Sequence, residues 1–487
     1  MDFSALQTLL TAMRGKTVVC VGDVMVDRFV HGEVARVSPE APIPVLLRGR
    51  ESAMLGGVGN VAANIAALGG RAILVAVVGD DATAHEAVKL AAEIEGLDAE
   101  LATQPGRTTS LKTRFVAAGQ QLLRVDEEDA SPIDRAVEGQ LTAAIGVASA
   151  AKAILISDYG KGAVAAPVMK ACRAAAASLG AALIVDSKSQ RFDAYGAVDL
   201  IKPNAAELAR VTGLPTGSDA EIETALSAAL LLCEAKAILV TRGPRGMSLA
   251  VRGEGVRHTP GAPRQVFDVV GAGDTAMAAL GLALAGGAGL DDAVALSVLA
   301  AGVVVGKHGT ATVGADEVIE AALAADRGPA EAKVATIERL VREVARWRDH
   351  GLKVGFTNGC FDVLHRGHVA YLAQASAWCD RLVVGLNSDG SVRALKGEGR
   401  PVNDLESRAL VLAALGSVDL VVAFDAETPL DLIKAVRPDV LIKGADYALE
   451  GVVGHEFVQS YGGEVKLAPL VEGFSTTAAI ARMTRSA

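Results

Sequence analysis

The segment "FTNGCFDVLHRGHVAYL", residues 356–372, is an apolar stretch that runs into Thr-Asn-Gly and then places His365 and His368 three residues apart. Three interpretations compete: metal ligands, packed core residues, or groups that bind a phosphate. A zinc site needs further ligands at reachable positions, and His455 is the only histidine that follows this segment. A buried pair of histidines beside Arg366 would be costly to desolvate.

Phosphate binding explains the context of the two histidines best. The segment reads as a strand, a loop that contains Asp362, and a helix that begins at the His-x-Gly-His motif. Backbone N–H groups at a helix N-terminus, together with imidazole N–H groups, can bind a polyphosphate. Gly367 allows the backbone to approach this group closely. The segment therefore predicts a nucleotide-binding α/β unit.

The same strand-to-helix pattern recurs along the whole chain. Runs such as "TVVCVGD", "AILVAVVGD", "AILISDYG", "AALIVDSK", "RLVVGLNSD" and "DVLIKGAD" end in Gly or Asp and lead into Ala-rich stretches. A content of 51% hydrophobic and only 3% aromatic residues is typical of parallel sheets covered by Ala-rich helices. We expect an α/β protein whose ligands bind at the C-terminal ends of the strands.

The length of 487 residues exceeds what one ordinary hydrophobic core supports. Between about 324 and 350 a Gly-Pro pair opens a charged, amphipathic stretch that has no strand pattern. We therefore predict a first domain at 1–325, a helical linker at 326–349 and a second domain at 350–487.

Charge and composition restrict the partners and the compartment. A net charge of −10 argues against general binding to nucleic acid or to an anionic membrane. The first residues, "MDFSALQTLLTAMRGK", lack the basic and apolar pattern expected of a secretory signal. The chain also lacks an uninterrupted run of about 20 apolar residues. The five cysteines have no CxxC spacing, which favours a reducing compartment. We expect a cytoplasmic protein that binds neither nucleic acid nor membrane.

A second motif lies in the first domain, in "VFDVVGAGDTAMAAL", residues 266–280. Here the run Gly271, Ala272 and Gly273 directly precedes Asp274 and a helix of small residues. Backbone N–H groups of such a turn can stabilise charge on a phosphoryl group in transit, and the aspartate can accept the proton of an attacking hydroxyl. Alternatively, the glycines only form a tight turn and the aspartate caps the helix.

Two further segments favour the catalytic interpretation. These are "VGDVMVDRF" at 21–29 and the glycine-rich "LGGVGNVAANIAALGG" at 55–70. Together with the D-x-x-GAGD segment, they follow the order and approximate spacing of the ribokinase-like carbohydrate kinases, which the chain resembles over about residues 15–315. The resemblance implies a ribokinase-like fold and an ATP-dependent sugar kinase.

The resemblance to these kinases also implies roles for individual residues. Asp274 would be the catalytic base, and Gly271, Ala272 and Gly273 would form the anion hole. Two residues of "KPNAAEL" would bind the nucleotide and hold Mg²⁺ through water, namely Asn204 and Glu207. Residues of "VTRGPRG" would lie along the nucleotide, namely Thr241, Gly243 and Gly246. Sugar hydroxyls would be held by Asp23, Asp27, Gly57 and Asn60. Structural alternatives are a turn cap for Asp23 and a solvated helix position for Glu207.

The second domain resembles the cytidylyl- and adenylyltransferases of the nucleotidylyltransferase superfamily, which implies a Rossmann-like fold. The likeness rests on the H-x-G-H motif, on "VGLNSDGSVRALKGEGRPV" at 384–402, on "LESRALVLAAL" with Arg408, and on "EGFSTTAAI" at 472–480. By this resemblance His365 and His368 stabilise the transition state at the α-phosphate. The triphosphate would be bound by Lys396, Ser475, Thr476 and Thr477. Lys396 could equally be a solvated loop residue, and Arg408 an exposed helix residue.

The order of the two domains is informative in itself. A ribokinase-like kinase followed by an H-x-G-H transferase resembles the bifunctional heptose-7-phosphate kinase/heptose-1-phosphate adenylyltransferase family of Gram-negative bacteria. This likeness implies ATP as co-substrate, Mg²⁺, sugar phosphates as small-molecule partners, and ADP-heptose for the lipopolysaccharide core as product. We expect a homodimer. Candidates for binding the 7-phosphate are Lys112, Arg114 and Lys161.

Two other functions stay open from the sequence. One is a different pairing, a pentose or hexose kinase fused to a cytidylyltransferase that acts on a polyol phosphate. The other is a chain in which one domain is an inactive ligand sensor. The joint presence of base, metal-site and transition-state residues, namely Asp274, Asn204, Glu207, His365 and His368, argues against the sensor.

Overall fold

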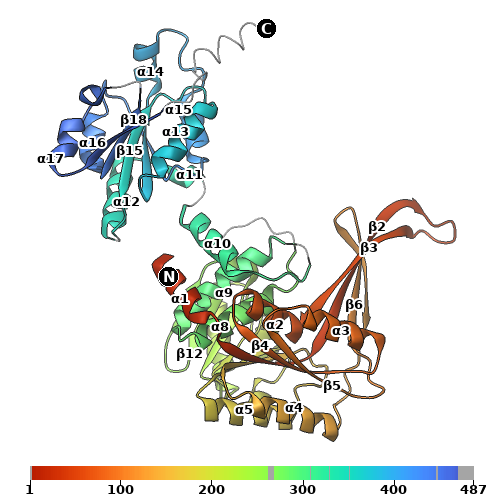
Figure 1. The fold of residues 1–487 in the computed structure, drawn as a ribbon. Helices are drawn as coiled ribbons and strands as arrows, with labels where there is room; N and C mark the ends of the chain where they lie inside the picture. Colours follow the sequence, from red (N-terminus) through yellow and green to blue (C-terminus); the bar gives the residue numbers. More distant parts are fainter. Residues whose placement is uncertain are drawn as a thin grey trace. The chain divides into compact units, whose positions relative to one another are not determined.

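The protein forms two compact α/β units, Met1–Leu323 and Ala324–Ala487 (Figure 1). The computed structural model describes residues 3–261, 268–307, 309–327, 330–349, 351–445 and 448–469. The predicted α/β class is confirmed, because each unit is built on a β-sheet with helices packed against it. None of the helices in these described ranges is long and apolar enough to cross a membrane.

The first unit is built around a nine-stranded sheet with the order β13-β12-β11-β10-β9-β8-β1-β4-β5. The strands from β11 to β5 pair in parallel, whereas β12 runs antiparallel to both of its neighbours. In chain order the strands are β1 (Thr17–Gly22), β4 (Arg71–Val78), β5 (Leu97–Thr103), β8 (Ala151–Asp158), β9 (Ala182–Ser187), β10 (Leu200–Ile201), β11 (Ala237–Thr241), β12 (Met247–Val251) and β13 (Val256–Thr259).

Helices cover both faces of this sheet, which explains why its strands read as unbroken apolar runs. In β1, Val18 and Cys20 pack into one core, while Val19 and Val21 pack into the core on the opposite face. The first core includes residues of α1 (Phe3–Met13), α2 (Val58–Ala67), α3 (Ala82–Ala92), α8 (Ala272–Ala285), α9 (Leu290–Val304) and α10 (Ala315–Arg327). The second includes residues of α4 (Arg135–Val147), α5 (Ala166–Leu179), α6 (Ala205–Thr212) and α7 (Asp219–Leu231).

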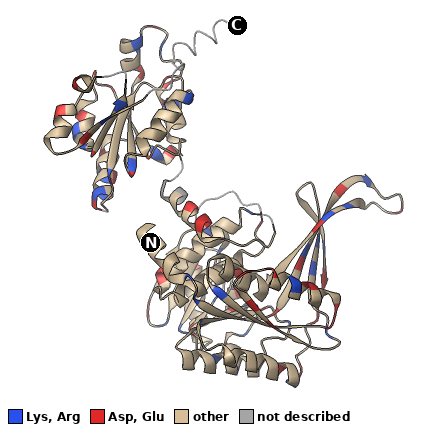
Figure 2. Cartoon of the chain, in the orientation of Figure 1, with Lys and Arg blue, Asp and Glu red and all other residues tan. Residues whose placement is uncertain are grey.

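A separate four-stranded sheet, with the order β3-β2-β6-β7, extends from the first unit (Figure 1). Its strands are β2 (Val24–Val37), β3 (Pro44–Gly57), β6 (Ser110–Ala117) and β7 (Gln120–Glu127). Charged residues of both signs lie along these strands (Figure 2). Because β2 follows β1 directly and β3 leads directly into α2, the base of this sheet is fixed to the C-terminal edge of the large sheet.

The second unit has a six-stranded sheet with the order β14-β17-β16-β15-β18-β19, in which all pairs are parallel. Its strands are β14 (Val334–Ala335), β15 (Val354–Gly359), β16 (Arg381–Asn387), β17 (Leu420–Phe424), β18 (Val440–Gly444) and β19 (Glu464–Ala468). Its helices are α11 (Ala330–Lys333), α12 (Ile337–Asp349), α13 (Arg366–Ser376), α14 (Asp389–Lys396), α15 (Leu405–Ala413), α16 (Leu430–Val436) and α17 (His455–Ser460).

The predicted linker, 326–349, packs within the second unit over much of its length. β14 pairs with β17, so this segment contains a short strand that its sequence pattern did not reveal. In α12, Leu340, Val344 and Trp347 are buried in the core of the second unit. The charged face of the helix stays outside, which is the usual arrangement of an amphipathic surface helix. The division between the two units falls at 323/324.

Candidate active sites

The first candidate site lies at the N-terminus of α8. The helix begins at Ala272, its N-cap is Gly271 with φ 78°, and no side chain caps it. A Cβ at Gly271 would lie 2.8 Å from Asn60 Nδ2, so both the backbone angle and the neighbouring side chain require glycine. Ala272 donates its own N–H to Val269 O at 3.3 Å. Of the three predicted anion-hole residues, Gly271 and Gly273 line the adjacent cavity.

Asp274 is buried in the first turn of α8 and is held by two neutral donors. Asn60 Nδ2 donates to Oδ2 at 3.0 Å, and the Tyr159 hydroxyl donates to Oδ1 at 2.9 Å. Burial, assisted by the negative charge of Asp186, raises the pKa of Asp274 to about 6. A carboxylate with a pKa near neutrality is well suited to accept a proton from an attacking hydroxyl.

A cavity of about 340 Å³ opens beside this carboxylate. Six of the residues predicted from the sequence line it: Asn204, Glu207, Thr241, Gly271, Gly273 and Asp274. Four further lining residues were not predicted: Tyr159, Asp186, Lys188 and Lys202. Each of these four lies at or directly after the C-terminal end of β8, β9 or β10. That position is the sequence signal that could have identified them.

Two lysines give the cavity its positive charge. Lys202 Nζ lies 2.9 Å from Asp186 Oδ2, and Lys188 Nζ lies 3.0 Å from Glu207 Oε1 and 3.6 Å from Asp186 Oδ1. Burial alone would lower the pKa of Lys188, but Asp186 and Glu207 raise it above its usual value. Both lysines are therefore suited to attract the phosphates of a nucleotide.

Asn204 and Glu207 form the capping box of α6. The backbone N–H of Asn204 donates to Glu207 Oε2 at 2.7 Å, and that of Glu207 donates to Asn204 Oδ1 at 2.8 Å. Because these oxygens are engaged, the pair fits a cation held through water better than one bound directly. Asp186 Oδ1 is buried without a hydrogen-bond partner among the described residues, so it can accept from such a water.

Asp23 organises the loop that follows β8. Its carboxylate accepts hydrogen bonds from the backbone N–H groups of Tyr159 at 2.8 Å, Lys161 at 3.0 Å and Ala163 at 3.1 Å. Burial raises the pKa of this carboxyl, whereas the three N–H groups act in the opposite direction. Asp23 therefore caps this turn, as the structural alternative predicted. Its predicted contact with a sugar stays a prediction.

Asp27 is also engaged within the protein. It forms a buried ion pair with Arg114, and Thr310 Oγ1 donates to its Oδ2 at 2.8 Å. Gly57, at the end of β3, has φ 58°, and a Cβ there would lie 2.4 Å from Asp23 O. Glycine is therefore required where β3 passes close to the Asp23 carbonyl, and the predicted contact of Gly57 with a sugar stays a prediction.

The predicted nucleotide-binding turn follows β11. Thr241 ends this strand and forms a parallel bridge with Asn204, which places it beside the capping box. Gly246 has φ 80°, and a Cβ there would lie 2.1 Å from Thr259 O. Gly243 has φ 58° with open space around it. Both glycines are thus explained by backbone conformation, and a contact with the nucleotide stays a prediction.

The second candidate site is formed by His365 and His368. His365 is the N-cap residue of α13, and the two imidazole rings stack with centroids 3.9 Å apart. Phe361 packs on His368 in an edge-to-face arrangement, with 5.3 Å between the ring centroids. Burial, together with the neighbouring His365, lowers the pKa of His368 to about 4. His368 is therefore neutral near pH 7 and can donate one N–H to a ligand.

Unsatisfied polar atoms indicate that this site is built for a ligand. His368 Nδ1 and Asn358 Oδ1 are buried and have no hydrogen-bond partner among the residues that the structure describes. Buried polar atoms are rarely left in this state unless a ligand or water completes them. Within the same described ranges, no group of three or more His, Cys, Asp or Glu side chains could hold a metal ion.

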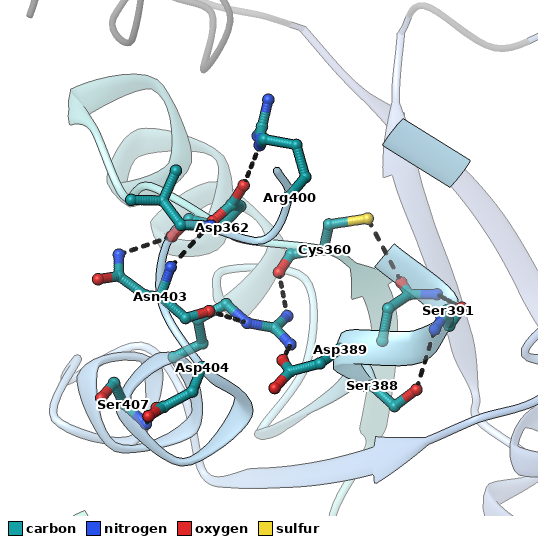
Figure 3. Close-up of polar contacts among 12 residues, drawn as sticks. Cys360, Asp362, Ser388, Asp389, Ser391, Arg400, Asn403, Asp404 and Ser407 are labelled. Atoms are coloured by element: carbon teal, nitrogen blue, oxygen red, sulfur yellow. Dashed lines mark hydrogen bonds and ion pairs between the residues drawn. The ribbon is translucent and has the colours of Figure 1, made fainter. Parts of the chain in front are cut away.

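A network around Asp362 fixes the loop beside the histidines (Figure 3). Asp362 forms an ion pair with Arg400 and accepts from the backbone N–H of Val402 at 2.6 Å, and Asn403 Nδ2 donates to Asp362 O at 2.9 Å. Burial alone would raise the pKa of Asp362, but Arg400 and the backbone N–H groups hold it below its usual range. Residues 400–403 are thereby attached to the start of the H-x-G-H loop.

Arg408 reinforces this attachment from α15. It is buried, and its guanidinium donates to Asn403 O at 3.0 Å, Cys360 O at 2.6 Å and Asp389 Oδ1 at 2.7 Å. The alternative of an exposed helix residue is therefore wrong for Arg408. Lys396, at the end of α14, is exposed. Ser475, Thr476 and Thr477 lie outside the described residues.

Comparisons with known proteins divide the chain in the same way. Residues 16–317 match the pfkB family of carbohydrate kinases, and residues 356–481 match the cytidylyltransferase-like family. A Bifunctional protein HldE of Caulobacter vibrioides is 52% identical over 98% of this chain and 99% of its own length. That of Hyphomonas neptunium is 50% identical, with the same coverage. Phosphofructokinase-2 from Escherichia coli, at 23% identity, has a TM-score of 0.53 and covers 63% of this chain and 98% of its own, which supports the fold.

Proposed function

The chain belongs to the family of bifunctional HldE proteins, and on this premise we propose how its residues carry out two reactions. It is a bifunctional enzyme of ADP-heptose biosynthesis. The kinase phosphorylates D-glycero-β-D-manno-heptose 7-phosphate at C1 with ATP. The adenylyltransferase joins AMP from ATP to heptose 1-phosphate and releases pyrophosphate and ADP-heptose.

In the kinase unit we assign Asp274 as the general base. It takes the proton of the C1 hydroxyl while that oxygen attacks the γ-phosphorus of ATP, and ADP leaves. The amides at the start of α8, at Gly271 and Gly273, then face the phosphoryl group in transit. Asn60 and Tyr159 orient the carboxylate through the hydrogen bonds described above.

We propose that Lys188 and Lys202 face the phosphates of ATP. Their carboxylate partners Asp186 and Glu207 keep both ammonium groups in the cavity before the nucleotide binds. Mg²⁺, when bound, neutralises phosphate charge, and Asn204, Glu207 and Asp186 are the residues that would hold its water ligands.

In the transferase unit we assign His365 and His368 to the α-phosphate of ATP. A phosphate oxygen of heptose 1-phosphate attacks the α-phosphorus, and pyrophosphate leaves. Charge develops on the α-phosphate oxygens during this step, and the imidazole N–H donors of the two histidines stabilise it. The Asp362–Arg400 pair keeps the neighbouring loop in place.

We also propose that the enzyme is a cytoplasmic homodimer whose partners are ATP and sugar phosphates. The net charge of −10 gives no general attraction for nucleic acid or for an anionic membrane.

The observation that carries this proposal is the presence, in one chain, of a buried Asp274 at an uncapped helix N-terminus and a paired H-x-G-H site. Product analysis by mass spectrometry tests it, with purified protein, ATP and Mg²⁺, and a panel of sugar phosphates and sugar 1-phosphates. We expect a heptose bisphosphate from heptose 7-phosphate and ADP-heptose from heptose 1-phosphate. Turnover of heptose 1-phosphate with CTP but not ATP would contradict the adenylyltransferase assignment.

A further inference from the structure

Two lysines from distant segments converge on one glutamate at the base of the small sheet. Lys112 Nζ, from β6, lies 3.4 Å from Glu128 Oε2, and Lys161 Nζ, from the loop after β8, lies 2.5 Å from Glu128 Oε1. The two lysine side chains are only 16% and 19% exposed, whereas Glu128 is 35% exposed. The cations are therefore held in place, and their carboxylate partner is the most accessible of the three.

The position of Lys161 is fixed relative to the catalytic base. Its backbone N–H donates to Asp23 Oδ2, the same oxygen that accepts from the N–H of Tyr159, and the Tyr159 hydroxyl donates to Asp274. On its other side, the carbonyl of Lys161 accepts from the Arg107 guanidinium. Two residues of chain span at most about 7 Å, so the backbone of Lys161 stays close to the tyrosine that contacts the base.

Lys112 reaches the same place from the small sheet. It is the register partner of Asp27 in the β2–β6 pair, so the two side chains lie on one face of that sheet. Asp27 accepts from Thr310, and Thr310 lies against Gly271 at the start of α8. The face that carries Lys112 is therefore the face directed towards the kinase site.

From this geometry we propose that Lys112 and Lys161 bind the phosphate that the sugar substrate of the kinase already carries, with Glu128 occupying their ammonium groups until that phosphate arrives. The inference rests on the proposed kinase function. In this arrangement the C1 hydroxyl of the sugar would face Asp274, and its phosphorylated end would face these cations.

The chemistry of the three side chains fits such an exchange. A phosphate brings close to two negative charges and three acceptor oxygens, so it binds two ammonium groups more strongly than one carboxylate does. Glu128 can turn into solvent because it is partly exposed. Asp126, the other carboxylate near Lys112, has a second cation in Arg124, at 2.8 Å. Arg114, the third candidate from the sequence, is committed to its buried pair with Asp27.

Steady-state kinetics of the intact chain test the proposal, with heptose 7-phosphate and phosphate-free heptose as alternative substrates. We expect Lys112→Ala and Lys161→Ala each to raise KM for heptose 7-phosphate about tenfold or more, with a much smaller change in kcat. Turnover of phosphate-free heptose should stay at the wild-type rate. Lys161→Arg, which keeps the charge, should recover part of the loss. Lys152→Ala, at an exposed position in β8, is the matched control and should behave as the wild type.

Calorimetric titration of heptose 7-phosphate into each variant provides a second readout that needs no turnover. Weaker binding in both lysine variants, at unchanged thermal stability, would support the subsite. Unchanged binding, or an equal loss for both substrates, would overturn it. A wild-type protein that is inactive on every heptose phosphate would instead refute the proposed kinase function, so the two failures can be told apart.

Discussion

The hydroxyl of Tyr159 donates a hydrogen bond of 2.9 Å to Oδ1 of Asp274, so the residue assigned as base is oriented by a side chain from the loop after β8. Burial, together with the charge of Asp274, raises the pKa of Tyr159 well above its usual value. The phenol therefore stays protonated and remains a donor. The same loop carries Lys161, so the base and the proposed phosphate subsite share one rigid support.

Tyr159→Phe should lower kcat of the kinase about tenfold, because a hydrogen bond to a charged carboxylate is lost. This hydrogen bond favours the ionised form of Asp274, so its loss should raise the pKa of that carboxyl and move the acidic limb of kcat/KM to higher pH. A pH profile measures both effects. Tyr461→Phe, in the second unit, is the control and should change neither. A drop in kcat without a shift of the limb would mean that Tyr159 does not act on the base.

The two half-reactions should depend differently on pH. Asp274 must be ionised to act as base, and its pKa is about 6, so kcat/KM of the kinase should fall about tenfold per pH unit below that value. His368, with a pKa of about 4, stays neutral over the same range. His368 should therefore contribute no acidic limb to adenylyl transfer between about pH 5 and 7. An acidic limb near pH 6 that disappears in His368→Ala would contradict this assignment.

Gly271→Ala should damage both stability and the kinase. A non-glycine residue at φ 78° costs about 1–2 kcal/mol, and its Cβ would also press on Asn60, which holds Asp274. Gly253→Ala separates the two effects, because Gly253 also has a positive φ but no atom within 4 Å of the added Cβ. Thermal unfolding should show a lower Tm in both variants. Kinase activity should fall only in Gly271→Ala, and an equal fall in both would show that strain alone is responsible.

The sequence could predict those residues of the two sites that lie within short motifs. Glycines followed by an aspartate, and two histidines at a helix start, carry their geometry within a few residues, because helix N-termini and tight turns are set locally. Asp274, His365 and His368 accordingly lie where the motifs placed them. Asn204 and Glu207 also lie at a helix start, although in this structure each side chain accepts a hydrogen bond from the backbone N–H of the other residue.

The remaining features depend on contacts between distant segments. Lys188 and Lys202 meet because β9 and β10 are neighbours in the sheet, an order that no local pattern specifies. Arg408 is buried because three oxygens from separate loops surround it, whereas an arginine on a helix is usually exposed. The small sheet was not predicted, since the outer parts of β2 and β3 are exposed and lack a continuous apolar run.

The central claim is that one chain holds two separate active sites, and paired single substitutions test it most directly. In Asp274→Asn, which keeps the shape of the side chain, we expect sugar phosphorylation to fall by a factor of about 10² or more, while pyrophosphate release from ATP and heptose 1-phosphate continues at the wild-type rate. In His368→Ala we expect the reverse, with kcat of adenylyl transfer lowered far more than ATP binding. Loss of both activities from either substitution, in a protein that remains folded, would contradict the account.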